Sequence, residues 1–141
     1  LSSGYYDAYY LRAQRVRTLL RQDFERAFEG VDAVVAPVCP TPAFRLGEKI
    51  DDPLKMYLSD IHVVAANPAG VPALALPCGF AAAQPDGARM PVGMQVIGPP
   101  MGEPLLFRIG GAYQRTTHWH RARPALPGLP AGESAQKEGT R

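Results

Sequence analysis

The sequence lacks the features that mark membrane-spanning and nucleic-acid-binding chains. No apolar run reaches the roughly 18 residues that a membrane-spanning helix needs, so we expect no membrane segment. The formal net charge is only +2, from 15 basic and 13 acidic side chains. A charge this small does not by itself indicate nucleic-acid binding. With 141 residues, 46% of them hydrophobic, the chain is instead typical of one globular domain with an ordinary core.

Cysteine is also scarce, which argues against a scaffold held together by disulfides. The two cysteines are Cys39, which lies beside prolines, and Cys78, which lies in an apolar run. They could in principle pair with each other. We expect instead two buried free thiols in a reducing compartment.

The first residue is Leu1 rather than Met, and the residues that follow it are already patterned as a helix. A natural N-terminus is usually less regular. We therefore interpret the chain as the C-terminal piece of a longer protein, with part of its chemistry upstream.

Apolar periodicity predicts an α/β fold with helices on the faces of a sheet. The expected elements are helices at 5–29, from 53 and at 103–117, and strands at 33–38, 73–80 and 91–98. The last two strands should be antiparallel neighbours, because a Pro-Asp-Gly turn at 85–87 joins them. We assign 1–120 to one domain and 121–141, which is rich in Pro, Gly and charge, to a flexible tail.

Local signals predict where the helices begin and end. Gly30 has the place of a C′ glycine after the first helix, and Asp52 followed by Pro53 is typical of a helix start. The segment 67–72 has the composition of a turn. The helix that starts at Pro53 should be largely buried through the apolar side chains of Leu54, Met56, Tyr57, Leu58 and Ile61.

Several motifs allow a functional interpretation, and each has a plainer alternative. The segment 2–4, Ser-Ser-Gly, is either the start of a nucleophile loop or a helix cap, and it lacks the neighbouring base that a nucleophile needs. His118 and His120 flank Trp119 and offer two zinc ligands without a third, so we predict no metal site. His62 either packs in the fold or lines a site.

The first helix carries arginines on the face opposite its apolar side chains. They are Arg12, Arg15, Arg21 and Arg26. Arginines in this arrangement either contact RNA phosphates, form a protein interface or remain in solvent.

Asp60 differs from these motifs, because no Lys or Arg follows it before Arg89. A carboxylate near the end of a mostly apolar helix must be exposed, capped or paired with a charge from elsewhere. The ammonium group of a ligand is one such charge.

Four segments together resemble the amidase signature family. They are LSSGYYDAYYLRAQRVRTLL, DAVVAPVCPTPAFRLGE, DPLKMYLSDIHVVAANPAGVPALALPCGF and PVGMQVIGPPMGEPLLFRIGGAYQ. The resemblance covers about residues 1–120 in family order. It is strongest to the A subunits of glutamyl-tRNA(Gln)/aspartyl-tRNA(Asn) amidotransferases, and it implies the C-terminal portion of the family's mixed β-sheet core flanked by helices.

The resemblance also implies a function and a set of partners. Such subunits are cytoplasmic glutaminases that use a Ser–cis-Ser–Lys triad upstream of the matched segments. The ammonia passes to a B subunit that uses ATP and Mg²⁺ to amidate mischarged tRNA, and a C subunit joins the two. The chain itself therefore supplies no catalytic residue and no cofactor site.

Within the chain, Asp60 aligns with the family aspartate that holds the α-ammonium group of glutamine, so it is the expected substrate-binding residue. The sequence departs from its relatives at Cys39, His62 and Pro68, which affects the expected shape of the pocket. Two other functions stay open. One is another amidase-signature hydrolase, and the other is a module that binds a partner subunit.

Overall fold

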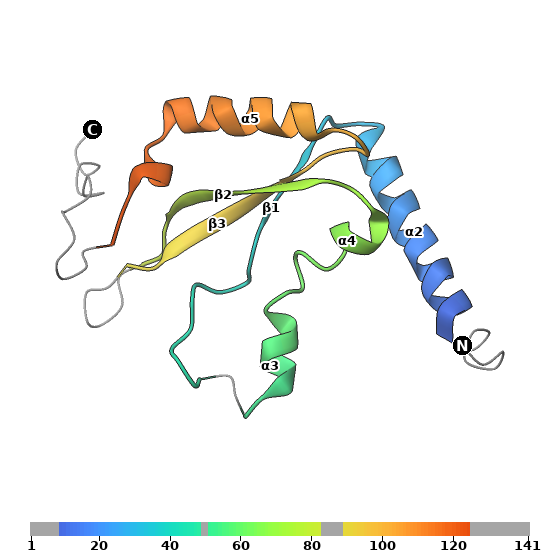
Figure 1. The fold of residues 1–141 in the computed structure, drawn as a ribbon, viewed down its shortest axis with the longest axis horizontal. Coiled ribbons are helices and arrows are strands. Elements are labelled where there is room, and N and C mark those ends of the chain that lie inside the picture. The colour runs from blue at the N-terminus through green and yellow to red at the C-terminus, as the bar shows by residue number, and fades with distance from the viewer. Residues whose placement is uncertain (1–8, 49–50, 83–88, 125–141) are drawn as a thin grey trace.

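The computed structural model describes residues 9–48, 51–82 and 89–124. Figure 1 shows a small sheet with one long helix lying along it and a second at its end. The elements are α2 (Leu11–Phe28), β1 (Val34–Pro37), α3 (Pro53–Leu58), α4 (Ala66–Ala69), β2 (Ala73–Phe80), β3 (Pro91–Ile97), α5 (Glu103–Thr116) and the short 3₁₀ helix η2 (Trp119–Arg121). The predicted tail lies mostly outside the described residues, as do the turn at 85–87 and the start of the first helix.

The sheet has the strand order β1-β3-β2, and both strand pairs are antiparallel. This confirms the three predicted strands and the antiparallel pairing of β2 with β3. In the register, Ile97 of β3 lies opposite Val34 of β1 and Ala73 of β2. The β2–β3 register shifts between Pro77 and Gly79, and Gly79 has a φ of 145° that suits glycine. The central strand β3 thus has neighbours on both edges.

Alternate side chains of β3 enter two different clusters, as the period of a strand requires. Val96 joins Leu76 and Leu106 of α5 on one face. Ile97 joins Ala66 and the other buried residues next to α4 on the opposite face. The predicted helix at 103–117 is therefore confirmed, and it covers the first of these two faces.

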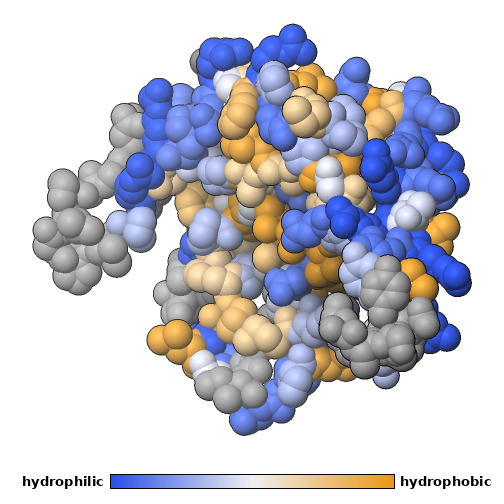
Figure 2. Space-filling model, turned by 45° about the vertical axis from the view of Figure 1, so that its right-hand side comes forward, coloured by the Kyte–Doolittle hydropathy of each residue, from blue (hydrophilic) through white to orange (hydrophobic). Residues whose placement is uncertain are grey.

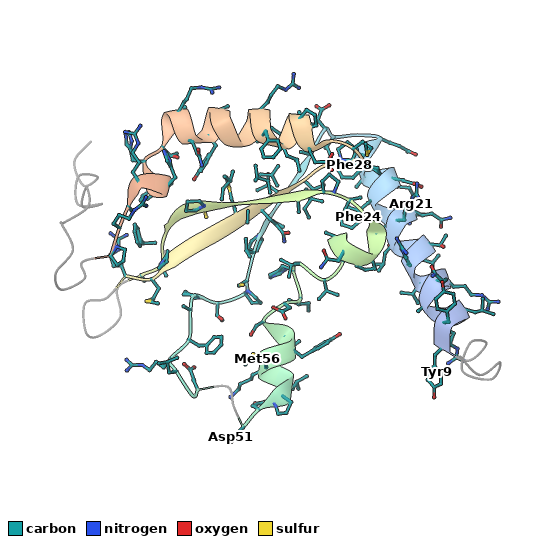
Figure 3. The ribbon with its side chains drawn as sticks, in the orientation of Figure 1. Tyr9, Arg21, Phe24, Phe28, Asp51 and Met56 are labelled. Atoms are coloured by element: carbon teal, nitrogen blue, oxygen red, sulfur yellow. The ribbon has the colours of Figure 1, made fainter. Side chains whose placement is uncertain are left out.

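The long helix α2 uses only part of its apolar face. Phe24 and Phe28 stack with ring centroids 6.1 Å apart and pack against the cluster beside α4 (Figure 3). Val16, closer to the N-terminus, is 55% exposed. The predicted C′ position of Gly30 is confirmed, since Glu29 is the C-cap of α2 and Gly30 follows it. Gly30 does not adopt the left-handed conformation common at this position. Its N–H donates to the carbonyl oxygen of Ala27 at 3.3 Å, which closes the last turn of the helix.

The prediction that α3 is largely buried is also wrong. None of its residues is buried, and Leu54 and Tyr57 are 65% and 70% exposed. Figure 1 shows why, since α3 stands away from the sheet at the end of the long loop after β1. Hydrophobic side chains therefore reach the surface beside hydrophilic ones (Figure 2). The amphipathic pattern that predicted a buried helix has no apolar partner among the described residues.

The predicted start of α3 is confirmed. The Asp52 carboxylate accepts a hydrogen bond from the backbone N–H of Lys55 at 3.0 Å, and Pro53 occupies the first helical position. This hydrogen bond lowers the pKa of Asp52 below its ordinary value of 3.8, helped by the Lys55 charge and opposed by partial desolvation. The ionised form of Asp52 is therefore favoured in the folded state.

We expect this cap to make stability depend on pH in acid. Because the folded pKa lies below the unfolded value, the stabilisation is present above pH 3.8 and is lost as pH falls through the lower folded value. Asn at position 52 retains an acceptor but no titrating charge. Urea unfolding of the intact protein and of Asp52→Asn should differ most near neutral pH and converge as pH falls below 3.8. If the difference in unfolding free energy between the two proteins does not change with pH, the charge of Asp52 does not contribute to stability.

The segment 67–72 is only partly a turn. Its first residues belong to the helical turn α4, which ends at Gly70 in the left-handed conformation with φ 72°. The N–H of Val71 reaches the carbonyl oxygen of Ala66 at 3.3 Å, as in a glycine-terminated helix. The predicted turn is therefore right at Gly70 and wrong at 67–69, which are helical.

We expect Gly70→Ala to destabilise the protein by about 1–2 kcal/mol, the cost of a Cβ in left-handed backbone. Among the described residues, the atom nearest to such a Cβ is Nη2 of Arg17 at 4.0 Å, so the cost is conformational rather than steric. Gly30→Ala is the matched control, because it has no described neighbour within 4 Å and no positive φ. Equal unfolding midpoints for the two variants would contradict this account.

Candidate functional site

A cavity of about 590 Å³ opens where the loop after β1 passes the start of β3. Most of one wall is the segment 37–44, and Pro91, Val92 and Gly93 form another. Ala81, after β2, and Ser59, after α3, complete the lining. Extended, proline-rich backbone cannot form sheet or helix hydrogen bonds regularly, so the loop stays open and leaves this space.

The cavity lining is mostly apolar. Its residues with polar side chains are Cys39, Thr41 and Ser59. Cys39 and Cys78 are both free, as predicted, but the prediction of burial is wrong for Cys39, which is exposed. Cys78 is half-buried, and its thiol donates to the carbonyl oxygen of Val92 at 3.4 Å. An apolar hollow with few polar groups is typical of a small-molecule site.

Asp60 follows Ser59 directly and is exposed. Its backbone carbonyl accepts hydrogen bonds from the N–H groups of Val63 and Val64 at 2.9 and 3.1 Å, so the segment after α3 is wound into a tight turn. Over the described ranges 9–48, 51–82 and 89–124, no Lys, Arg or His forms an ion pair with its carboxylate. Asp60 therefore stands next to a cavity-lining residue with its charge available to a ligand.

A further polar residue, Gln95, was missed by the sequence interpretation. It is 2% exposed at the centre of β3, and its side-chain amide donates to the carbonyl oxygen of Pro37 at 3.0 Å and to that of His62 at 2.6 Å. A buried carbonyl left without a partner costs about 1–3 kcal/mol. The sequence feature that could have identified Gln95 is a glutamine inside an otherwise apolar strand, because buried polar side chains nearly always form hydrogen bonds.

The other candidate motifs do not converge on this cavity. His62 is exposed and contributes its carbonyl oxygen to the contact with Gln95. His118 and His120 lie around η2, where Trp119 packs edge-on against Phe80 with centroids 5.9 Å apart. Among the described residues, no three His, Cys, Asp or Glu side chains gather as a metal site would require. The Ser-Ser-Gly segment at 2–4 lies outside the described residues.

The arginines of α2 are partly used within the chain. Arg21 pairs with Glu25 at 2.9 Å, and Arg26 pairs with Asp23. Arg17, which the sequence interpretation did not single out, donates from Nε to the carbonyl oxygen of Pro68 at 2.8 Å. The arginine side chains thus stabilise α2 and its contact with α4, which fits the plainer interpretation of this face. Separately, no helix in the described ranges is long and apolar enough to cross a membrane.

Comparison with known proteins finds one family model, Amidase, which matches residues 1–107. The A subunit of glutamyl-tRNA(Gln) amidotransferase from Thermodesulfovibrio yellowstonii is 54% identical over 126 residues, 89% of this chain and 25% of that protein. The corresponding protein of Chloroflexus aurantiacus is 57% identical over the same shares. The crystal structure of the Thermotoga maritima counterpart superposes with a TM-score of 0.71 at 34% identity, covering 94% of this chain and 27% of that one. The chain spans about a quarter of the length of the curated relatives it matches.

Proposed function

Because this chain belongs to the amidase family, we propose that it is the C-terminal part of the glutaminase subunit of a tRNA-dependent amidotransferase. The observation that carries the proposal is identity of 52–57% over most of the chain to proteins named as the A subunit of glutamyl-tRNA(Gln) amidotransferase. The complete subunit would hydrolyse glutamine and supply ammonia for the conversion of Glu-tRNA(Gln) to Gln-tRNA(Gln), of Asp-tRNA(Asn) to Asn-tRNA(Asn), or of both.

The proposal places the nucleophile and its base in the part of the subunit that this chain does not contain. Among the residues that the structure describes, Ser59 and Lys55 lie close together, on and just after α3. Ser59 Oγ donates to the backbone carbonyl of Lys55 at 3.0 Å, and Lys55 Nζ lies 3.5 Å from the Asp52 carboxylate. Both contacts stabilise α3, so we assign these two side chains a structural role.

Asp60 is the residue of this chain that we assign to substrate binding. Its carboxylate would hold the α-ammonium group of glutamine, and the neighbouring apolar cavity would accept the rest of a small ligand. A charge pair of this kind gains strength when water is excluded around it. Such a contact orients glutamine for attack on its side-chain amide by a nucleophile from the rest of the subunit.

The partners follow from the same proposal. A B subunit would receive the ammonia and use ATP and Mg²⁺ to activate the mischarged tRNA, and a C subunit would hold the two together. We assign no cofactor to this chain. A protein that acts on aminoacyl-tRNA works where translation takes place, so we place it in the cytoplasm and not at a membrane.

A second candidate, a subunit-interface module, is favoured by one observation. Leu54, Tyr57 and Ile61 leave more than half of their surface exposed on and just after α3, and exposed apolar groups that lie together mark contact surfaces. This role is compatible with glutaminase function, because the covering surface can come from the rest of the same protein or from a partner. Another amidase-signature hydrolase remains the alternative within enzymes.

The experiment that tests the proposed function uses the full-length protein carrying this chain, combined with its B and C subunits. Glutamine labelled with ¹⁵N in the side-chain amide is supplied with ATP, Mg²⁺ and Glu-tRNA(Gln) or Asp-tRNA(Asn). We expect the label to appear in the amide of the aminoacyl group. Hydrolysis of some other amide, with no labelled aminoacyl-tRNA, would favour the alternative hydrolase.

A further inference from the structure

We propose that Gln95 is a positioning residue that joins the cavity wall after β1 to the turn after α3 and thereby sets the place of Asp60. The inference rests on the proposed function in so far as Asp60 binds glutamine. The contacts that carry it are the two hydrogen bonds from the Gln95 side-chain amide to Pro37 and His62.

The chemistry of these contacts needs a primary amide. Both partners are backbone carbonyl oxygens, which only accept, so the group that faces them must donate twice. The NH₂ group has two hydrogens, one for each carbonyl. A carboxylate at this position would place its oxygens against the carbonyl oxygens, and neither can donate a hydrogen bond. An apolar side chain would leave both carbonyls without this donor.

The two carbonyls belong to different elements, one that lines the cavity and one that carries Asp60. Pro37 is the last residue of β1 and the first residue of the cavity-lining segment 37–44. His62 lies in the turn that follows α3, two residues after Asp60. That turn is closed by the hydrogen bonds from Val63 and Val64 to the Asp60 carbonyl. Fixing the His62 carbonyl therefore fixes the turn that carries the Asp60 side chain.

The strand register leaves room for this reach. Gln95 lies opposite Ala36 on β1 and Ala75 on β2, and side chains at directly opposed positions share one face of the sheet. Two alanines leave the space above that face open, so a long side chain can extend across it to His62. Because β3 is paired on both edges, the base of the Gln95 side chain is anchored in the most constrained strand of the sheet.

The test compares Gln95→Met with wild type in the full-length protein, assembled with its B and C subunits. Met has a similar length and no donor. Met94→Leu, on the same strand with its side chain packed in the cluster that includes Leu106, controls for a general disturbance of β3. We expect Gln95→Met to raise KM for glutamine about tenfold with kcat within about threefold. Amidation driven by added ammonia should be unchanged, and Met94→Leu should match wild type in both.

Hydrogen exchange measured on the same complexes tests the hydrogen bonds themselves. In Gln95→Met, amides in 57–66 should exchange faster while those in β2 stay as in wild type. Unchanged exchange at 57–66 would overturn the proposal. Equal losses of glutamine-driven and ammonia-driven amidation in Gln95→Met would also overturn it. The same holds if Gln95→Met exchanges faster at 57–66 but keeps the wild-type KM, while the separate variant Asp60→Asn raises KM.

Failure of the proposed function gives a different pattern. If Asp60→Asn leaves KM for glutamine unchanged, the assignment of Asp60 fails whatever Gln95 does. The exchange difference between 57–66 and β2 then decides alone whether Gln95 holds the turn in place.

Discussion

Replacing Asp60 by Asn in the assembled complex is expected to lower kcat/KM for glutamine by about thirtyfold to several thousandfold. Asp60 is exposed in this chain, and we expect the rest of the complete subunit to shield its pair with the ammonium group from water. Breaking a shielded charge pair costs roughly 2–5 kcal/mol, and each 1.4 kcal/mol is about tenfold. If the ammonium contact is equally strong in the ground and transition states, most of the loss will appear in KM. The fold should persist, because Asn has nearly the same shape and the turn at 60–64 is held by backbone hydrogen bonds.

Amidation driven by added ammonia provides the internal control, because ammonia bypasses the glutamine pocket. Asp51→Asn is the matched variant, since Asp51 is exposed and lies at the far end of α3 (Figure 3). It should leave both activities close to wild type. If glutamine-driven and ammonia-driven amidation fall together in Asp60→Asn, Asp60 is structural, and if neither falls it has no part in binding.

The second large effect concerns the chain by itself. A preparation of these 141 residues should release no ammonia from glutamine above background, because we place the nucleophile and its base elsewhere in the complete protein. Loss of a whole catalytic triad costs on the order of a millionfold in kcat. Release of ammonia is followed at increasing glutamine concentrations against a buffer blank. Saturable activity that survives further purification would show that the chemistry lies within this chain.

The features that were predicted correctly depend on signals that lie close together in the sequence. The Asp52–Pro53 pair specifies a helix start, and the hydrogen bond that caps the helix joins residues only three positions apart. The apolar runs of β2 and β3 identify strands because short apolar runs bounded by turn residues are a local property of the sequence. Their antiparallel pairing followed from the short connection between them.

The features that were missed depend on tertiary contacts between segments that are far apart in the sequence. An amphipathic pattern shows that α3 has an apolar face, but burial requires a partner surface, which the described residues do not supply. Cys39 is exposed for a similar reason, because the proline-rich loop that carries it runs along the edge of a cavity. Gln95 was overlooked because its partners, Pro37 and His62, lie 58 and 33 residues away.

The identification of Asp60 came from both sources. No Lys or Arg follows Asp60 before Arg89, which pointed to a charge partner from elsewhere, and the structure adds that Ser59, its neighbour, lines a cavity. Its role toward glutamine is a proposal that rests on family resemblance. The structure contributes that Ser59, the residue before Asp60, lines an apolar hollow of a size that suits a small ligand.

The most direct test of this account compares glutamine with glutaramate, which has the same side-chain amide and no α-ammonium group. The kcat/KM for release of ammonia is measured with both substrates, using wild type and Asp60→Asn in the assembled complex. We expect Asp60→Asn to lower kcat/KM for glutamine by about thirtyfold or more and kcat/KM for glutaramate by no more than about twofold. Combining the substitution with removal of the ammonium group from the substrate isolates the energy of the charge pair between them. Equal penalties for the two substrates would show that Asp60 does not contact the ammonium group of glutamine.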